Sequence, residues 1–203
     1  GEFYFDKLRY DDATSIYKSF IALNPFHSVS PHFGMRVIGI YGEAGFPLLV
    51  VESKREFATT YALDAEYWQH FDVQESPDVI AFLKTNLTDL AGHYHALYQD
   101  ENLIDDRGSN FDEAQRWYRQ LLASFPTDPE TPQVNYQLAD LLLENGDFDE
   151  AAREYERTAY DYADHEKASA AGYAAVYSYR KSLEVATGAR QREVKMLTAE
   201  SSL

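Results

Sequence analysis

The histidines are the first residues whose chemistry has to be considered, because two pairs of them lie close together in the sequence. His93 and His95 are two residues apart, and on a helix they would point about 200° away from each other. They therefore cannot bind one metal ion as two histidines four residues apart could. We interpret one as packed and the other as exposed. His27 and His32 flank Pro31, and we find no acidic residue in the sequence placed to complete a site with them.

A short acidic segment is the second candidate for ion binding. It reads Asp105-Asp106-Arg107-Gly108-Ser109-Asn110. It lacks the alternating acidic residues and the closing glutamate of an EF-hand calcium loop. We interpret it as an acidic loop that caps a helix over 110–125. Because loops carry function more often than packed helices do, it is also a candidate contact surface.

Catalytic and cofactor-binding motifs are the third possibility. Gly39, Gly42 and Gly45 do not follow the strand–turn–helix pattern of a dinucleotide site. The sequence contains no G-x-S-x-G element, and no serine has an evident histidine partner. Glu52 and Glu56 share a helix face with basic residues between them, which is typical of solvated surface. We predict no catalytic, cofactor-binding or metal-binding residue, and we expect that the protein is not an enzyme.

Composition narrows the class of partner. The formal net charge is -16, and the chain contains no cysteine. Such a negative surface repels phosphate groups, so we expect neither nucleic acid nor an anionic membrane as a ligand. Disulfides and thiolate metal sites are excluded. The longest apolar run, 46–51, is far shorter than the roughly 20 residues of a spanning helix. A protein or peptide partner, including a basic one, remains open, and the oligomeric state is left undetermined.

The elements that carry these residues follow a repeat. Leu138-Ala139 is followed by Gly146, Ala151 and Tyr155. The two alanines allow two antiparallel helices to approach closely, and Gly146 is placed where a helix ends in a left-handed backbone. Asp147 then stands where a side chain can cap the next helix.

This pattern resembles the tetratricopeptide repeat, and its spacing recurs along the chain. Phe111-Asp112-Glu113-Ala114, with Tyr118 and Pro126 after it, repeats the segment from Phe148 to Ala151. The resemblance implies an all-α fold, a right-handed solenoid of antiparallel helix hairpins. We expect a single array over 1–186, with units at about 1–25, 26–62, 77–126 and 127–163 and a partial unit at 167–186.

Helix boundaries can also be predicted from the repeat and from its breaks. Thr187-Gly188 is expected to break the pattern, and residues 187–203 to start a further helix or form a truncated tail. We interpret the chain as a piece of a longer array. About eleven surplus residues near 100–108 predict either a longer helix over 77–99 or a protruding loop. Helices are expected near 1–6, 10–23, 30–44, 46–62, 64–71, 77–99, 110–125, 131–145, 148–163, 167–186 and 190–200.

Two sequence segments, 117–126 and 155–162, have a residue pattern similar to that of the tetratricopeptide proteins of Gram-negative cell envelopes. Each segment belongs to the aromatic-rich second helix of an expected hairpin. That group includes the outer-membrane assembly lipoprotein and the coordinator of the Tol-Pal system. The resemblance implies a periplasmic or outer-membrane-associated protein, with the cytoplasm left open as an alternative.

In this family the first helix of each hairpin lines the concave, partner-binding face. Carried onto this sequence, the resemblance implies ten partner-binding positions: His32, Met35, Thr88, His95, Gln133, Tyr136, Asp140, Leu143, Glu144 and Tyr179. The first hypothesis is a protein-interaction scaffold of an envelope assembly. The alternative is a carbohydrate-binding or polysaccharide-export scaffold that uses exposed aromatic residues, with Trp68 and Trp117 as reporters of sugar binding.

Overall fold

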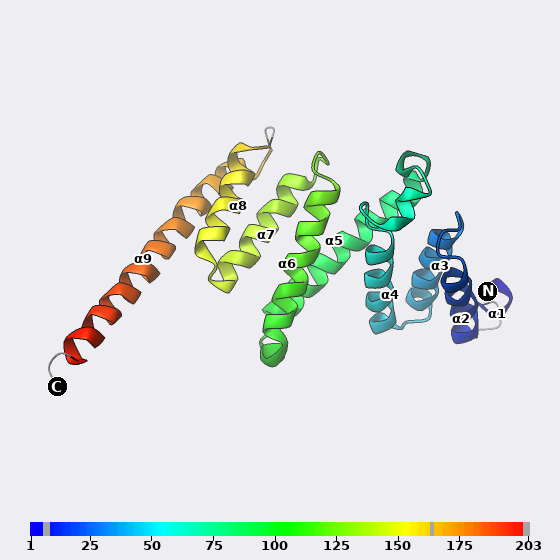
Figure 1. The fold of residues 1–203 in the computed structure, drawn as a ribbon, viewed down its shortest axis with the longest axis horizontal. Helices are drawn as coiled ribbons and strands as arrows, with labels where there is room; N and C mark the ends of the chain where they lie inside the picture. Colours follow the sequence, from blue (N-terminus) through cyan, green and yellow to red (C-terminus); the bar gives the residue numbers. More distant parts are fainter. Residues whose placement is uncertain (6–8, 163–164, 201–203) are drawn as a thin grey trace. The chain divides into compact units, whose positions relative to one another are not determined.

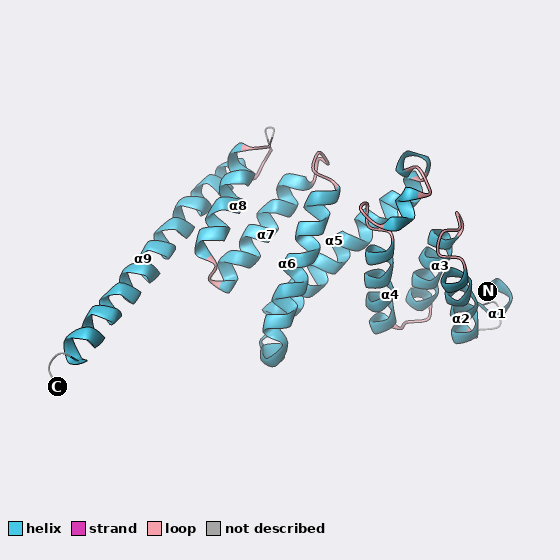
Figure 2. Cartoon of the chain, viewed as in Figure 1, coloured by secondary structure: helices cyan, strands magenta, loops and turns pink. Residues whose placement is uncertain are grey.

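The structure is a computed structural model that describes residues 1–5, 9–162 and 165–200. These residues form helices joined by short connections, with no strand anywhere in the described ranges (Figure 2). The all-α prediction is confirmed. The chain divides into two compact units, Gly1–Ser124 and Phe125–Leu203, here called unit 1 and unit 2. The single array expected over 1–186 stays a prediction.

Unit 1 is a series of helices in which each packs against the next along the chain (Figure 1). Pro31, Pro47 and Pro77 stand in the first turns of three of them, where a missing backbone N–H costs nothing. The elements of the unit are α1 (Glu2–Phe5), α2 (Tyr10–Leu23), α3 (Ser30–Glu43), α4 (Pro47–Thr60), η1 (Glu66–Gln69), η2 (Val73–Glu75), α5 (Pro77–Gln99), η3 (Glu101–Asp106) and α6 (Arg107–Ser124).

Aromatic rings fill much of the core of unit 1. Phe57 of α4 packs edge-on against Phe82 of α5, with ring centroids 5.1 Å apart, and its ring also lies 4.8 Å from that of Tyr61. Trp117 of α6 has no exposed surface, and its indole N–H donates to Glu113 at 2.9 Å. Because each ring removes a large apolar area from water, a few such residues supply most of the packing.

Unit 2 contains α7 (Thr131–Asn145), α8 (Phe148–Tyr160) and α9 (Ala168–Glu200). Helix α8 packs against both of its neighbours. The predicted turn is confirmed, because Gly146 ends α7 with φ 88°, a conformation that glycine adopts without strain. Ala139 and Ala151 are fully buried, as expected for a close helix contact. Asp147 stands at the start of α8, but its carboxylate accepts from Asn145 and makes no cap bond.

The predicted break at Thr187-Gly188 is wrong, because α9 runs without interruption from Ala168 to Glu200. A single glycine inside a helix costs only about 1 kcal/mol relative to alanine. Ala186 and Ala189 flank the pair, and good helix formers on both sides offset that cost. Residues 201–203 of the expected tail lie outside the described residues. The helix expected at 148–163 ends earlier, at Tyr160.

Two connections also differ from the prediction. The helix expected near 64–71 is a single 3-10 turn, Glu66–Gln69. The surplus residues near 100–108 form no protruding loop: α5 ends at Gln99 as predicted, and the 3-10 helix Glu101–Asp106 leads directly into α6. Asp100 starts this 3-10 helix by accepting from the backbone N–H of Asn102 at 2.9 Å. Helix α6 therefore begins at Arg107 rather than at 110.

Candidate partner-binding surface

Five of the predicted positions lie on one face of α7. Successive positions are three or four residues apart, except that Leu143 and Glu144 are neighbours, and such spacing places side chains on one side of a helix. Four of them are half-buried and Glu144 is exposed, whereas Leu138, Ala139 and Leu142 on the other side of the helix are core residues. We name this face the α7 stripe: Gln133, Tyr136, Asp140, Leu143 and Glu144.

The centre of the α7 stripe is held in place by Tyr155 of α8. The Tyr155 ring packs against that of Tyr136 with centroids 5.3 Å apart and planes at 68°. Its hydroxyl donates to the carboxylate of Asp140 in a short hydrogen bond. Burial, and then this bond, raise the pKa of Tyr155 above its ordinary value. The hydroxyl therefore stays a donor, and it fixes where the Asp140 carboxylate points.

Tyr136 also faces a cation. The ammonium of Lys167 lies 5.6 Å from the centroid of the Tyr136 ring, within the range of a cation–π contact. Burial and the charge of Asp140 raise the pKa of Tyr136. The stripe thus offers a ring, a fixed carboxylate and, at Glu144, a second acidic side chain. Such a surface suits a hydrogen-bond donor or a basic side chain.

Beneath the stripe, Asn135 ties α7 to α8. Its side-chain amide donates to the backbone oxygen of Glu154 at 2.7 Å and to the hydroxyl of Thr158 at 2.9 Å. Asn135 and Thr158 are both fully buried. Because a buried amide is costly to leave unpaired, these bonds fix the register of the two helices.

Tyr179, which was expected to close the groove, is engaged by α8. Its hydroxyl donates to the carboxylate of Glu156 at 2.7 Å, and Ser182, three residues on, donates to Asp149 of the same helix. The hydroxyl of Tyr179 is therefore bonded to α8 and not to a member of the α7 stripe. Its role in partner binding stays a prediction.

In unit 1, His32 and Met35 lie on α3. The Nε2 atom of His32 is 2.9 Å from a carboxylate oxygen of Asp78, in the first turn of α5. Burial alone would raise the pKa of Asp78, but the bonds from His32 and from the backbone of Val79 lower it overall. The sequence did not predict this contact of His32 with an acidic residue of another helix. Met35 is half-buried.

Thr88 and His95 lie on α5. The Thr88 hydroxyl is exposed and donates to the carbonyl of Lys84 in its own helix. One ring nitrogen of His95 is 3.0 Å from the hydroxyl of Tyr118 on α6, and the other is 3.3 Å from the side-chain amide of Gln99. His95 therefore joins α5 to α6, and both of its nitrogens are occupied.

Metal binding finds no support in the part of the chain that the structure describes, where no group of three suitable side chains is close enough to hold an ion. His93 and His95 are both half-buried, so the expected division into one packed and one exposed histidine is wrong. Burial lowers the pKa of His93, and the charge of Lys54 adds to the effect.

The tryptophans are not exposed platforms for sugars. Trp117 is core, and the indole N–H of Trp68 donates to the backbone oxygen of Tyr61 at 3.1 Å. Among the described residues, the most exposed rings are two tyrosines of unit 2: the exposed fraction is 74% for Tyr160 and 79% for Tyr173.

Sequence reasoning missed the ion pairs that join the helices of unit 1. Arg36 of α3 binds Glu2 of α1 at 2.7 Å, and Lys54 of α4 binds Asp89 of α5. Arg55 of α4 reaches Glu113 of α6 at 2.9 Å. The basic residues between Glu52 and Glu56 were a signal, because four charges within five residues of one helix can also pair with charges on neighbouring helices.

A comparison with protein families identifies the repeat to which part of this surface belongs. Residues 106–171 match the tetratricopeptide repeat family. The match extends from the end of η3 through α7 and α8 to the first turn of α9, so it includes the whole α7 stripe. No curated protein matches the chain.

The family match and the helices themselves together show three general properties of the chain. The helices of the family pack as sequential antiparallel pairs, as α7 and α8 do here. Among the described helices, none combines the length and the apolar character needed to cross a membrane. Residues 106–171 therefore carry a tetratricopeptide repeat, a protein-interaction scaffold that is typically not catalytic.

Proposed function

We propose that this chain is a scaffold in a bacterial envelope assembly and that it binds a segment of a partner protein through the α7 stripe. The observation that carries the proposal is the constellation of Tyr136, Asp140 and Tyr155, inside the segment that matches the tetratricopeptide repeat. Its ring and carboxylate are fixed before a partner arrives, so binding loses little side-chain freedom.

A basic partner segment suits this surface best. Asp140 and Glu144 lie one helical turn apart on the stripe, in a chain of net charge -16. Acidic residues so arranged attract lysine or arginine at long range and slow their release at contact. The periplasm or the outer membrane is the proposed location, supported by the similarity of residues 117–126 and 155–162 to envelope proteins.

The test is a crosslinking pull-down from envelope extract with the intact chain and two matched double variants. Tyr136→Ala with Glu144→Lys changes the stripe. Tyr160→Ala with Glu166→Lys makes the same chemical changes at exposed positions off the stripe. We expect the first double variant to lose at least tenfold of a defined partner and the second to keep it. Equal recovery with both variants would remove the stripe from the proposal.

A carbohydrate-binding scaffold is the second candidate, and exposed tyrosines favour it. Tyr160 lies against α9: its hydroxyl is 3.4 Å from the point that a Cβ would occupy if Gly172 had one. Tyr173 follows Gly172 in the sequence and is also exposed. Aromatic rings of this kind stack on sugar faces. This candidate predicts the opposite result, with glycan binding lost in the Tyr160 double variant and kept in the Tyr136 double variant. Glycan array binding of both variants separates the two functions.

A further inference from the structure

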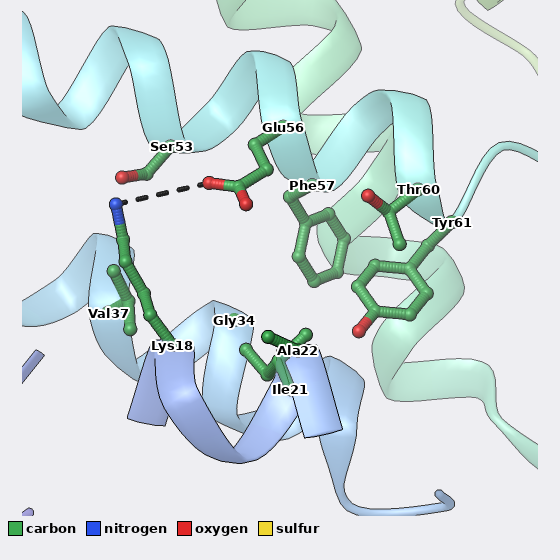
Figure 3. A pocket seen from close by; sticks show the side chains of 10 residues that line it. All are labelled: Lys18, Ile21, Ala22, Gly34, Val37, Ser53, Glu56, Phe57, Thr60 and Tyr61. Atoms are coloured by element: carbon green, nitrogen blue, oxygen red, sulfur yellow. Dashed lines mark ion pairs between the residues drawn. The ribbon is translucent and has the colours of Figure 1, made fainter. Parts of the chain in front are cut away.

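A hollow lies inside unit 1 between α2, α3 and α4 (Figure 3). Its volume is about 100 Å³. Ile21 and Ala22 of α2, Val37 of α3 and Phe57 of α4 are among the side chains that line it. Figure 3 shows the ring of Phe57 reaching from α4 toward α2. The interior is therefore mostly apolar.

Two hydroxyl groups line this hollow without a hydrogen-bond partner. They belong to Ser53 and Tyr61, whose exposed fractions are 5% and 2%. Nearly all buried polar groups in proteins have a partner, so each exception needs an explanation. Burial also raises the pKa of Tyr61, which keeps its hydroxyl neutral and able to donate. Two orphaned donors at one hollow indicate that something else supplies their acceptors.

The two hydroxyl groups stand at opposite ends of the hollow. Ser53 and Tyr61 are eight residues apart along α4 and its C-cap, which corresponds to about 12 Å of helix. At the Ser53 end, Lys18 and Glu56 form an exposed ion pair 3.9 Å long that joins α2 to α4 (Figure 3). A matching occupant has an apolar middle and a hydrogen-bonding atom at each end. It carries no net charge, because the interior around Ile21, Ala22 and Phe57 is mostly apolar.

The size of the hollow selects a single side chain. A water molecule needs only about 10–15 Å³, and pockets for drug-sized ligands have about 300–1,000 Å³. The observed 100 Å³ lies between these limits. Gly34 on α3 helps to set the width, since a Cβ there would lie 3.0 Å from the Phe57 ring. One buried anchor side chain in such a pocket is the usual source of affinity at a protein interface.

We propose that this hollow binds one uncharged polar side chain with an apolar stem, of the glutamine type, from a partner protein. The backbone of the bound residue accepts a hydrogen bond from Ser53, its stem fills the space between Ile21 and Phe57, and its tip accepts from Tyr61. This site is separate from the α7 stripe, and it stands whether or not the stripe binds a partner.

The first experiment uses blocked amino acids as probes of the intact protein. N-acetyl-glutamine amide, its methionine analogue and its glutamate analogue have the same backbone and stems of similar length. Binding is followed by NMR shifts of the Ile21 and Val37 methyl groups. We expect millimolar binding of the glutamine probe, with glutamate at least tenfold weaker because of its charge. Tyr61→Phe should weaken glutamine about tenfold and methionine less than threefold.

The second experiment uses variants whose stability is measured without any probe. Tyr61→Phe removes an unpartnered hydroxyl, so we expect the melting temperature to stay level or to rise by about 2–4 °C while glutamine binding falls. Tyr67→Phe is the matched control: its buried ring packs on Tyr61 at 5.0 Å, and it should leave probe binding unchanged. Ala22→Leu should fill the hollow and abolish binding of the uncharged probes.

Four outcomes would overturn the proposal. The first is no saturable shift with any probe. The second is equal loss of binding in Tyr61→Phe and Tyr67→Phe. The third is a lower melting temperature in Tyr61→Phe without probe binding, which would show that ordered water already satisfies the hydroxyl. Binding of free p-cresol but of no blocked amino acid would also reject a partner side chain and would indicate a small-molecule pocket.

Discussion

The two compact units use different residues to hold their helices together. In unit 1 the helices are separated by large rings, among them Phe57, Tyr61 and Trp117, which are all buried. In unit 2 the buried residues around α8 include several small ones, such as Ala139, Ala151 and Ala171, each with no exposed surface. Tyr155 is the single buried aromatic side chain among the described residues of unit 2.

This difference has a consequence for polar groups. Rings are rigid and bulky, so their packing in unit 1 leaves a hollow and several hydroxyl or amide groups without a partner, at Ser53, Tyr61 and Asn86. Small residues let helix backbones approach in unit 2, where Asn135 reaches the backbone of Glu154 directly. Large rings thus leave a hollow at Ser53 and Tyr61, whereas α7 and α8 approach closely enough for a direct bond from a side-chain amide to the backbone.

The largest expected effect comes from removing a ring in unit 1. Phe57→Ala deletes a side chain that is 3% exposed and that contacts two other rings. We expect the free energy of unfolding to fall by about 3–5 kcal/mol. Hydrogen exchange measured residue by residue should show the loss in α3, α4 and α5. Tyr160→Ala, at an exposed ring, should change stability by less than about 0.5 kcal/mol.

A second prediction places the same substitution in both units. Ala151→Leu adds bulk at a fully buried position between helices of unit 2. It should cost about 1–3 kcal/mol or more, because neighbouring side chains are forced off their rotamers. Ala22→Leu adds the same bulk beside the hollow of unit 1 and should cost less than about 0.5 kcal/mol. Urea denaturation of the two variants measures this difference, and equal costs would contradict the packing contrast.

A third prediction compares two buried asparagines. Asn135→Ala removes two buried hydrogen bonds, to the backbone of Glu154 and to the hydroxyl of Thr158, so it should cost about 1–3 kcal/mol. The side-chain nitrogen of Asn86, 1% exposed on α5, has no partner. Asn86→Ala should therefore cost less than half as much. Thermal denaturation of both variants against wild type tests the comparison, which fails if the two losses are the same.

The smallest expected effect is a change in the stability of unit 1 with pH. Hydrogen bonds from Arg36 and then Tyr17 lower the pKa of Glu2 from 4.5 to about 2. Because the folded-state pKa is depressed, its stabilisation is full above pH 4.5 and is lost as the pH falls toward 2. Glu2 is exposed, so the loss should stay below about 1 kcal/mol.

Denaturation midpoints at pH 5 and pH 2.5 measure this effect. Wild type should lose more stability over that interval than Glu2→Gln does. Glu166→Gln, at an exposed position of unit 2, is the control and should behave as wild type. A steeper pH dependence in Glu2→Gln would reverse the sign of the argument and reject it.

Much of the helical fold could be predicted from sequence spacing. Alanine and glycine at fixed offsets predicted the turn at Gly146 and the close contact at Ala139. The α7 stripe followed from the same periodicity, since residues three or four apart share a face. Predictions failed where local preference and context compete, as at Gly188, where one weak residue does not end a long helix.

The sequence by itself determined the all-α class, the repeat at 106–171 and the acidic character of the surface, because these depend on residue type and on spacing along one helix. Only the tertiary structure decided which side chains meet. The bond from Tyr155 to Asp140 and the contact between His32 and Asp78 join residues of different helices. The hollow at Ser53 and Tyr61 has the same origin, because an unfilled space depends on how three helices pack and has no signature in any one of them.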